Sequence, residues 1–286
     1  MYRPTRPPRS MAAQTDWGFF LDFIGRKGKL GQAQLTRWEN KRARMYPRHW
    51  PTMRSEFESF THRHLYHLTA MDIQAAAVRT EHSLGNLQDT VGEKDWGPGK
   101  GTTEDWSPPC PFFFIWHSLL ERDGRIPLGQ EAWRYLLRER LDLLAHPFAQ
   151  HFGAREGWLE GGELRDGFQW RLGKSYYSFL RETEVLVKLR RLHGLDVLYH
   201  FLIDAEWAAD AVGGQVLAAI NVGNPKYSEG KAGRKRSCAE LNPGFEVVKL
   251  QLKAENTFGK VWRASDEGIA MAADRLKKAG CPTIPQ

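Results

Sequence analysis

Apolar residues recur at intervals of three and four through most of the first half of the chain, which is the spacing of helices with one buried face. No run in this half alternates apolar and polar residues as a half-buried strand does. Proline and glycine are dense over 89–111, so we expect a long connection without regular structure there. The expected helices, after an apolar block over 17–24, cover 30–45, 53–68, 71–87, 112–121 and 129–144.

The pattern changes in the second half of the chain. A helix is expected over 175–193, closed by Gly194. Apolar runs, in part alternating with polar residues, predict three strands, and a last helix with one apolar face follows them. These elements cover 196–203, 215–222 and 245–252 for the strands and 266–278 for the helix. Helices and strands in this order are typical of a sheet covered by helices.

We therefore expect an α+β protein with two domains. Residues 16–152 are expected to form a mainly helical domain, and residues 174–286 a domain with a small mixed sheet flanked by helices. The charged, glycine-rich stretch 153–173 is expected to link them. Residues 1–15 begin with a basic, proline-rich stretch that no hydrophobic segment long enough for a secretory signal follows, so we expect a disordered leader.

Composition narrows the partners and the compartment. The net charge of +7 favours an anionic partner, of which nucleic acid is the commonest. The three cysteines form no Cys-x-x-Cys pair, which is typical of a reducing compartment and argues against a thiolate zinc site. No apolar run reaches the ~20 residues of a membrane span, so we expect a cytoplasmic protein without a membrane partner. Most of the 11 tryptophans are expected to be buried.

Carboxylates stand where a metal-dependent phosphodiesterase needs them. Such a site gathers several acids around a hard cation and brings a lysine to the attacking water. Glu184 lies in the expected helix, and Asp210 opens a hairpin that leads to Asn221. Residues two apart on a strand share a face, so an acid at 221 and a lysine at 223 would complete the site. The chain has Asn221 and Gly223 there.

This layout resembles the restriction-endonuclease-like (PD-D/E-x-K) nuclease superfamily over 174–286. The resemblance implies a restriction-endonuclease-like α/β domain and a Mg²⁺ site with Glu184 and Asp210 as metal ligands. The family's strand acid and lysine fall on Asn221 and Gly223, so the motif is degenerate. Lys226 in the following loop is the candidate that replaces the missing lysine. The resemblance thus implies a catalytic set of Glu184, Asp210, Asn221 and Lys226, with Mg²⁺ as cofactor if the site is active.

Other residues of the same region can substitute in this set. Glu182 is the second choice for the helical acid, and Asp204 or Glu206 could replace the missing strand acid. Lys231 is the second choice for the lysine.

A basic loop follows the expected second strand. It carries five cations against one acid, and glycines that allow close approach to a phosphate backbone. An exposed tyrosine there would offer a stacking face. A solvated surface loop explains the same composition. The nucleic-acid-binding candidates are Lys226, Tyr227, Lys231, Arg234, Lys235 and Arg236.

A second basic stretch lies on the expected helix 30–45 and just before it. It comprises Lys27, Lys29, Arg37, Lys41, Arg42 and Arg44. These side chains could bind an anion or simply form the wet face of an amphipathic helix.

Three functional hypotheses follow. The first is a DNA- or RNA-binding protein with an inactive nuclease-like domain, acting with protein partners in a larger defence or mobile-element assembly; this setting is an analogy from the fold. The second is a Mg²⁺-dependent endonuclease with a rearranged active site. The third is a structural subunit that binds only protein.

Overall fold

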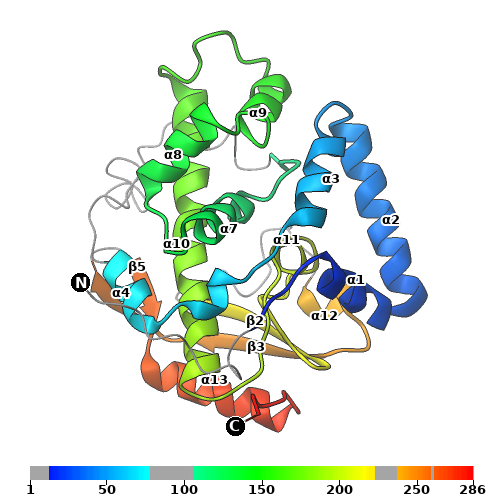
Figure 1. The fold of residues 1–286 in the computed structure, drawn as a ribbon, viewed down its shortest axis with the longest axis vertical. Coiled ribbons are helices and arrows are strands. Elements are labelled where there is room, and N and C mark those ends of the chain that lie inside the picture. Colours follow the sequence, from blue (N-terminus) through cyan, green and yellow to red (C-terminus); the bar gives the residue numbers. More distant parts are fainter. Residues whose placement is uncertain (1–12, 78–102, 104–105, 223–236, 259–260, 286) are drawn as a thin grey trace.

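The computed structural model describes residues 13–77, 103, 106–222, 237–258 and 261–285, and it is an α+β protein in which helices dominate (Figure 1). The expected fold class is confirmed at this level, including a small mixed sheet flanked by helices. The first helices are α1 (Trp17–Arg26), α2 (Gly28–Met45), α3 (Trp50–Ser59), the 3-10 helix η2 (His64–His67) and α4 (Ala70–Ala77). They are followed by α7 (Phe112–Asp123), α8 (Gly129–Arg138), α9 (Ala145–Phe152) and α10 (Glu163–Arg191).

The sheet lies in the second half of the chain. Strand β1 (Ala211–Gly213) pairs antiparallel with β2 (Val216–Val222), and β2 pairs in parallel with β3 (Glu246–Leu252). The strand order is β1-β2-β3, so the sheet is mixed. Strands β4 (Ala254–Phe258) and β5 (Val261–Ala264) form a separate antiparallel pair. The remaining helices are α11 (Phe201–Trp207), α12 (Cys238–Leu241) and α13 (Asp266–Lys278).

Helices cover the sheet, and α10 runs the length of the molecule (Figure 1). Alternate residues of β3 are buried, namely Val248, Leu250 and Leu252, and this strand packs on α13. Lys249 and Gln251, between them, are exposed. The alternation is that of a strand with one covered face, as the sequence predicted.

One hydrophobic core joins the two halves of the chain. The Phe23 ring of α1 lies 5.4 Å from that of Phe245, just before β3, and Phe20 lies 5.4 Å from Trp207 of α11. Lys27 donates to the Leu241 carbonyl at 2.8 Å. Six tryptophans are less than 9% exposed, as expected from the sequence: Trp38, Trp50, Trp106, Trp116, Trp170 and Trp207.

The structure corrects several boundaries. Residues 163–173, expected in a linker, belong to α10. The expected strand 196–203 makes one isolated bridge, between Leu198 and Val212, and α11 begins at Phe201. A short apolar run fits a buried strand or a buried helix equally, and here the His200 side chain caps the helix by accepting from the Leu202 N–H.

The first half also departs from the expected boundaries. Helix α3 ends at Ser59 and α8 at Arg138, so the expected helices 53–68 and 129–144 are shorter. Thr15, placed in the leader, is fully buried and pairs with His62. Residues 1–12 and most of 78–105 lie outside the described residues. None of the helices in the described part combines the length and apolar character needed to span a bilayer.

A buried ion-pair network fixes α10 against β5 and α13. The Glu184 carboxylate is 1% exposed and accepts from Arg263 of β5 at 2.8 Å. Lys188, one turn further along α10, lies 2.8 Å from Glu184 and 2.6 Å from Asp266 of α13. Burial lowers the pKa of Lys188, but hydrogen bonds to Asp266 and Glu184 outweigh this effect, and the pKa is raised. Lys188 therefore stays charged at neutral pH.

Replacing Glu184 tests this network. Glu184→Gln would leave Arg263 and Lys188 without their buried counter-charge, and the free energy of unfolding should fall by about 3–5 kcal/mol. Chemical unfolding of the wild type and the variant measures the loss. Glu163→Gln, at an exposed position of the same helix, is the control and should change stability by less than about 0.5 kcal/mol. Equal stability of Glu184→Gln and the wild type would contradict the role.

Three histidines meet in the core beside α7 and α11. The ring of His62 lies 4.7 Å from that of His117 and 5.8 Å from that of His200, and each histidine is at most 3% exposed. His62 and His200 accept backbone N–H groups, which requires unprotonated rings. Burial, reinforced by the neighbouring rings at His62 and His117, lowers all three pKa values, those of His117 and His200 to about 3.

These pKa shifts predict acid lability. In the unfolded chain a histidine takes up a proton below about pH 6.5, whereas folded His117 and His200 do so only near pH 3. Each should therefore lower the free energy of unfolding by up to about 1.4 kcal/mol per unit as the pH falls through that window. Urea unfolding at a series of pH values should show a shallower loss for His117→Gln. The exposed His151→Gln is the control, and equal slopes for His117→Gln and the wild type would refute the assignment.

Candidate carboxylate site

Three carboxylates from two segments of the chain converge beside the sheet. One side-chain oxygen each of Glu182, Asp204 and Asp210 lies within 4.8 Å of the other two. Asp204 is 8% exposed, and the other two residues are half-buried. Like charges at this distance repel in a medium less polar than water, so a bound cation would stabilise the arrangement.

The long helix α10 positions Glu182. Glu182 and Glu184 are two residues apart, which is about 200° around a helix, so their side chains leave α10 on different sides. Glu184 faces Arg263 and Lys188, and this leaves Glu182 directed to the segment that carries the two aspartates. The ion-pair network thus fixes the rotation of α10 that presents Glu182.

Helix α11 positions Asp204. The helix begins after His200, and the hydroxyl of buried Tyr199 donates to the Asp204 carboxylate at 3.0 Å. This hydrogen bond occupies one oxygen of Asp204 and fixes its direction. Burial raises the pKa of Tyr199, and the negative charges of Asp204, Glu182 and Asp210 raise it further. The phenol therefore remains a hydrogen-bond donor to Asp204.

A left-handed turn brings Asp210 back to Asp204. Ala208 ends α11 with a φ of 53°, and its N–H donates to the Asp204 carbonyl at 3.0 Å. Asp210 then enters the hairpin, where its N–H donates to the Ala218 carbonyl at 2.9 Å. Its carboxylate accepts the N–H of Ile220. Only five residues therefore separate two carboxylates that face the same point.

The three carboxylates fit a hard divalent cation. Mg²⁺ and Ca²⁺ prefer oxygen ligands, and oxygens on opposite sides of the ion lie about 4.2 Å apart for Mg²⁺ and about 4.8 Å apart for Ca²⁺. No two of the three oxygens are farther apart than the spacing for Ca²⁺. Softer ions that prefer thiolate or imidazole find neither in this cluster.

The site residues that the sequence predicted have different surroundings in the structure. Asp210 lies in the carboxylate cluster, whereas Glu184 does not, because it is ion-paired with Arg263 and Lys188. Asn221 is half-buried on β2, in register with Gln251 of β3. Glu206 is ion-paired with Arg42 at 2.7 Å. The candidates of the basic loop, Lys226, Tyr227, Lys231, Arg234, Lys235 and Arg236, lie outside the described residues.

Glu182 and Asp204 were only second choices on sequence. Glu184 stands four residues before Lys188, and this i,i+4 spacing of opposite charges was a sign that Glu184 is engaged within its own helix. The position of Asp204 had no such sign, because the segment around it was expected to be a strand.

A lysine of β3 lies in the same row of the sheet as Asp210. The hydrogen bonds of Asp210 to Ala218 and Ile220 place it opposite Ala219, and Ala219 is the register partner of Lys249. At ~4.8 Å per strand, the Cα atoms of Asp210 and Lys249 are about 10 Å apart. Burial raises the pKa of the nearby Cys238 thiol to about 11, and both Asp210 and Lys249 contribute charge there.

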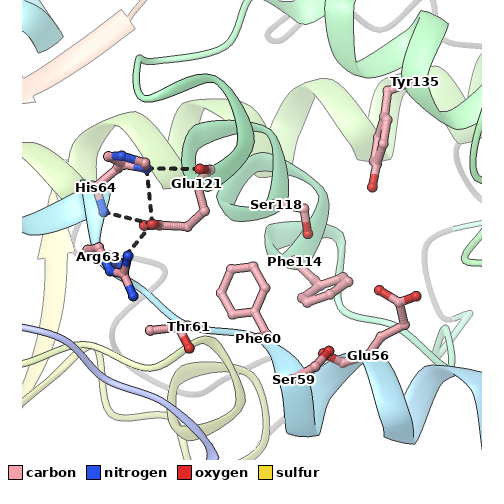
Figure 2. Close-up of a pocket in the computed structure, with 10 residues that line it drawn as sticks. All are labelled: Glu56, Ser59, Phe60, Thr61, Arg63, His64, Phe114, Ser118, Glu121 and Tyr135. Atoms are coloured by element: carbon pink, nitrogen blue, oxygen red, sulfur yellow. Dashed lines mark hydrogen bonds and ion pairs between the residues drawn. The ribbon is translucent and has the colours of Figure 1, made fainter.

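A cavity of about 380 Å³ lies elsewhere, between α3, α7 and α8 (Figure 2). Phe60 and Phe114 form its floor, and Glu56 and Glu121 lie on opposite sides. The Glu121 carboxylate accepts the backbone N–H groups of Arg63 and His64 at 2.8 and 2.7 Å. These hydrogen bonds engage Glu121 in holding the start of η2.

Comparisons with known proteins add no family to this description. No protein-family model matches the chain, and searches of curated proteins and of solved structures found no match.

Proposed function

We propose that this protein is a divalent-metal-dependent nuclease with a rearranged active site. The observation that carries the proposal is the convergence of Glu182, Asp204 and Asp210. The proposal is also supported by the order of the elements along the chain. A helical acid, an acid at the start of a hairpin and a parallel neighbouring strand follow one another as in the restriction-endonuclease-like superfamily. The net charge of +7 suits a polyanionic substrate.

Each residue has a distinct part in this proposal. Glu182, Asp204 and Asp210 would hold the cation through their carboxylate oxygens. The bound ion would stabilise charge on the phosphate and lower the pKa of a water molecule. Tyr199 orients Asp204, and the Ile220 N–H orients Asp210, so two of the three carboxylates are fixed before any ligand arrives.

Lys249 would supply the cation that the family places two residues after the strand acid. Lys249 and Asp210 lie in the same row of the sheet, so the ammonium group of Lys249 could orient the attacking water and neutralise developing charge. Lys249 is exposed. It belongs to the described residues, whereas Lys226 and Lys231 lie outside them.

A second candidate function is nucleic-acid binding without cleavage. It is favoured by the sequence Asn221–Gly223, which has neither the acid nor the lysine of the family motif. In that case the carboxylates would bind a structural ion or none.

Metal binding and cleavage test the carboxylate site. Glu182→Gln and Asp204→Asn keep the shape of the side chains but remove a negative ligand, so Mn²⁺ affinity measured by calorimetry should fall at least about tenfold. Cleavage of plasmid DNA or RNA with Mg²⁺ or Mn²⁺ should be lost with it.

Glu163→Gln on the same α10 helix is the control and should behave as the wild type. Wild-type protein that binds Mn²⁺ but cleaves no substrate would support the second candidate function. Wild-type protein that does neither would refute the site.

Lys249→Met tests the lysine. Removing a group that assists the attacking water should lower kcat by about 10²–10⁴-fold and leave Mn²⁺ affinity unchanged. The matched control is Lys253→Met, an exposed lysine four residues further along the same segment. Equal kcat values for the two variants, measured in single-turnover cleavage, would exclude Lys249 from this role.

A further inference from the structure

Helix α2 presents a row of cations to solvent. Lys29, Arg37, Lys41 and Arg44 are all exposed. At about 100° per residue they fall within a sector of about 120° of the helix surface. We call this sector the outer cationic face. In Figure 1, α2 lies at the edge of the molecule, away from the central helix α10.

The other cations of the basic stretch, Lys27 and Arg42, lie toward the opposite, buried side of α2. Leu35 and Trp38 are buried there. Arg42 is 6% exposed and ion-paired with Glu206, and buried Lys27, at the N-cap of the helix, binds the Leu241 carbonyl. Packing therefore explains Lys27 and Arg42, and it does not explain the four residues of the outer cationic face.

Within the described residues, no ion pair occupies the outer cationic face. The acid of α2, Glu39, lies outside the sector and is paired with Arg54 of α3 at 2.9 Å. The face is therefore a local concentration of positive charge held on a rigid helix, which attracts a polyanion.

We propose that the outer cationic face of α2 binds the phosphate backbone of duplex nucleic acid. Lys29 and Arg44 are separated by about 22 Å along the helix axis. One strand of a duplex carries a phosphate for about every 3.4 Å of the duplex axis and winds around that axis, so a face of this length can contact about three phosphates of a strand.

The composition of the face selects a duplex over other polyanions. The remaining exposed residues of the sector are Leu30, Ala33 and Asn40, so there is no aromatic ring on which unpaired bases could stack. A membrane-surface helix needs an exposed apolar side, but the apolar side of α2 is buried in the core.

The inner side of α2 connects this face with the carboxylate site. Arg42 binds Glu206 at 2.7 Å, and Gln34 accepts from the Trp207 indole at 3.0 Å. Both partners belong to α11, the helix that carries Asp204. The inference deepens the proposed nuclease function, on which it rests, by naming a surface that holds the substrate and the form of the substrate.

The test compares two triple variants of equal charge. Arg37→Gln, Lys41→Gln and Arg44→Gln neutralise the outer cationic face, whereas Arg275→Gln, Lys277→Gln and Lys278→Gln neutralise three exposed cations of α13. Binding of a short DNA duplex of arbitrary sequence is measured over a range of salt concentrations. The α2 variant should bind at least about tenfold more weakly, with a salt dependence reduced by about two to three phosphate contacts. The α13 variant should keep wild-type affinity.

Three results would overturn the inference: equal loss in both variants, no duplex affinity in the wild type, or stronger α2-dependent binding to anionic phosphatidylserine vesicles than to the duplex. Circular dichroism shows whether each variant remains folded. Metal-dependent hydrolysis of bis(p-nitrophenyl) phosphate, too small to span α2, separates the two proposals. If the α2 variant keeps this hydrolysis but loses duplex binding, both proposals are supported. If the wild type shows no such hydrolysis, only the nuclease proposal is refuted.

Discussion

The buried pairing of Glu184 with Arg263 and Lys188 is the constraint on which the rest of the structure depends. Helix α10 spans the molecule, and this network determines which of its sides faces β5 and α13. Because Glu182 leaves the helix on a different side, fixing Glu184 also fixes the direction of Glu182. The ion-paired Glu184 thereby sets the position of Glu182, which belongs to the carboxylate cluster.

The carboxylate site and the α2 surface are built on the same scaffold. Helix α11 carries Asp204 on one side and contacts α2 through Glu206 and Trp207. The hairpin that holds Asp210 lies beside Lys249 of β3. Rigid helices and strands, rather than long loops, therefore position every described group that the two proposals use.

Periodicity in the sequence was sufficient for much of the fold but not for the site. The last helix and the strands β2 and β3 were predictable because each has a clear apolar spacing. The segment before Asp204 was not, since a short apolar run fits strand and helix alike and a histidine cap decided the outcome. Asp210 was found through its place at the start of the hairpin. Choosing Glu184 over Glu182 failed to anticipate the cluster, because two acids of one helix cannot be ranked without knowing which neighbour faces each.

The turn at Ala208 has a thermodynamic consequence. Asp204 and Asp210 belong to one short segment, whereas Glu182 comes from α10, so all three meet only when the segment has docked on the helix. An ion held by the three carboxylates would bind the folded chain alone and would raise the melting temperature as its concentration increases. A divalent cation held in this way would act as a clamp between the segment and α10, and thermal melting would report its occupancy without any substrate.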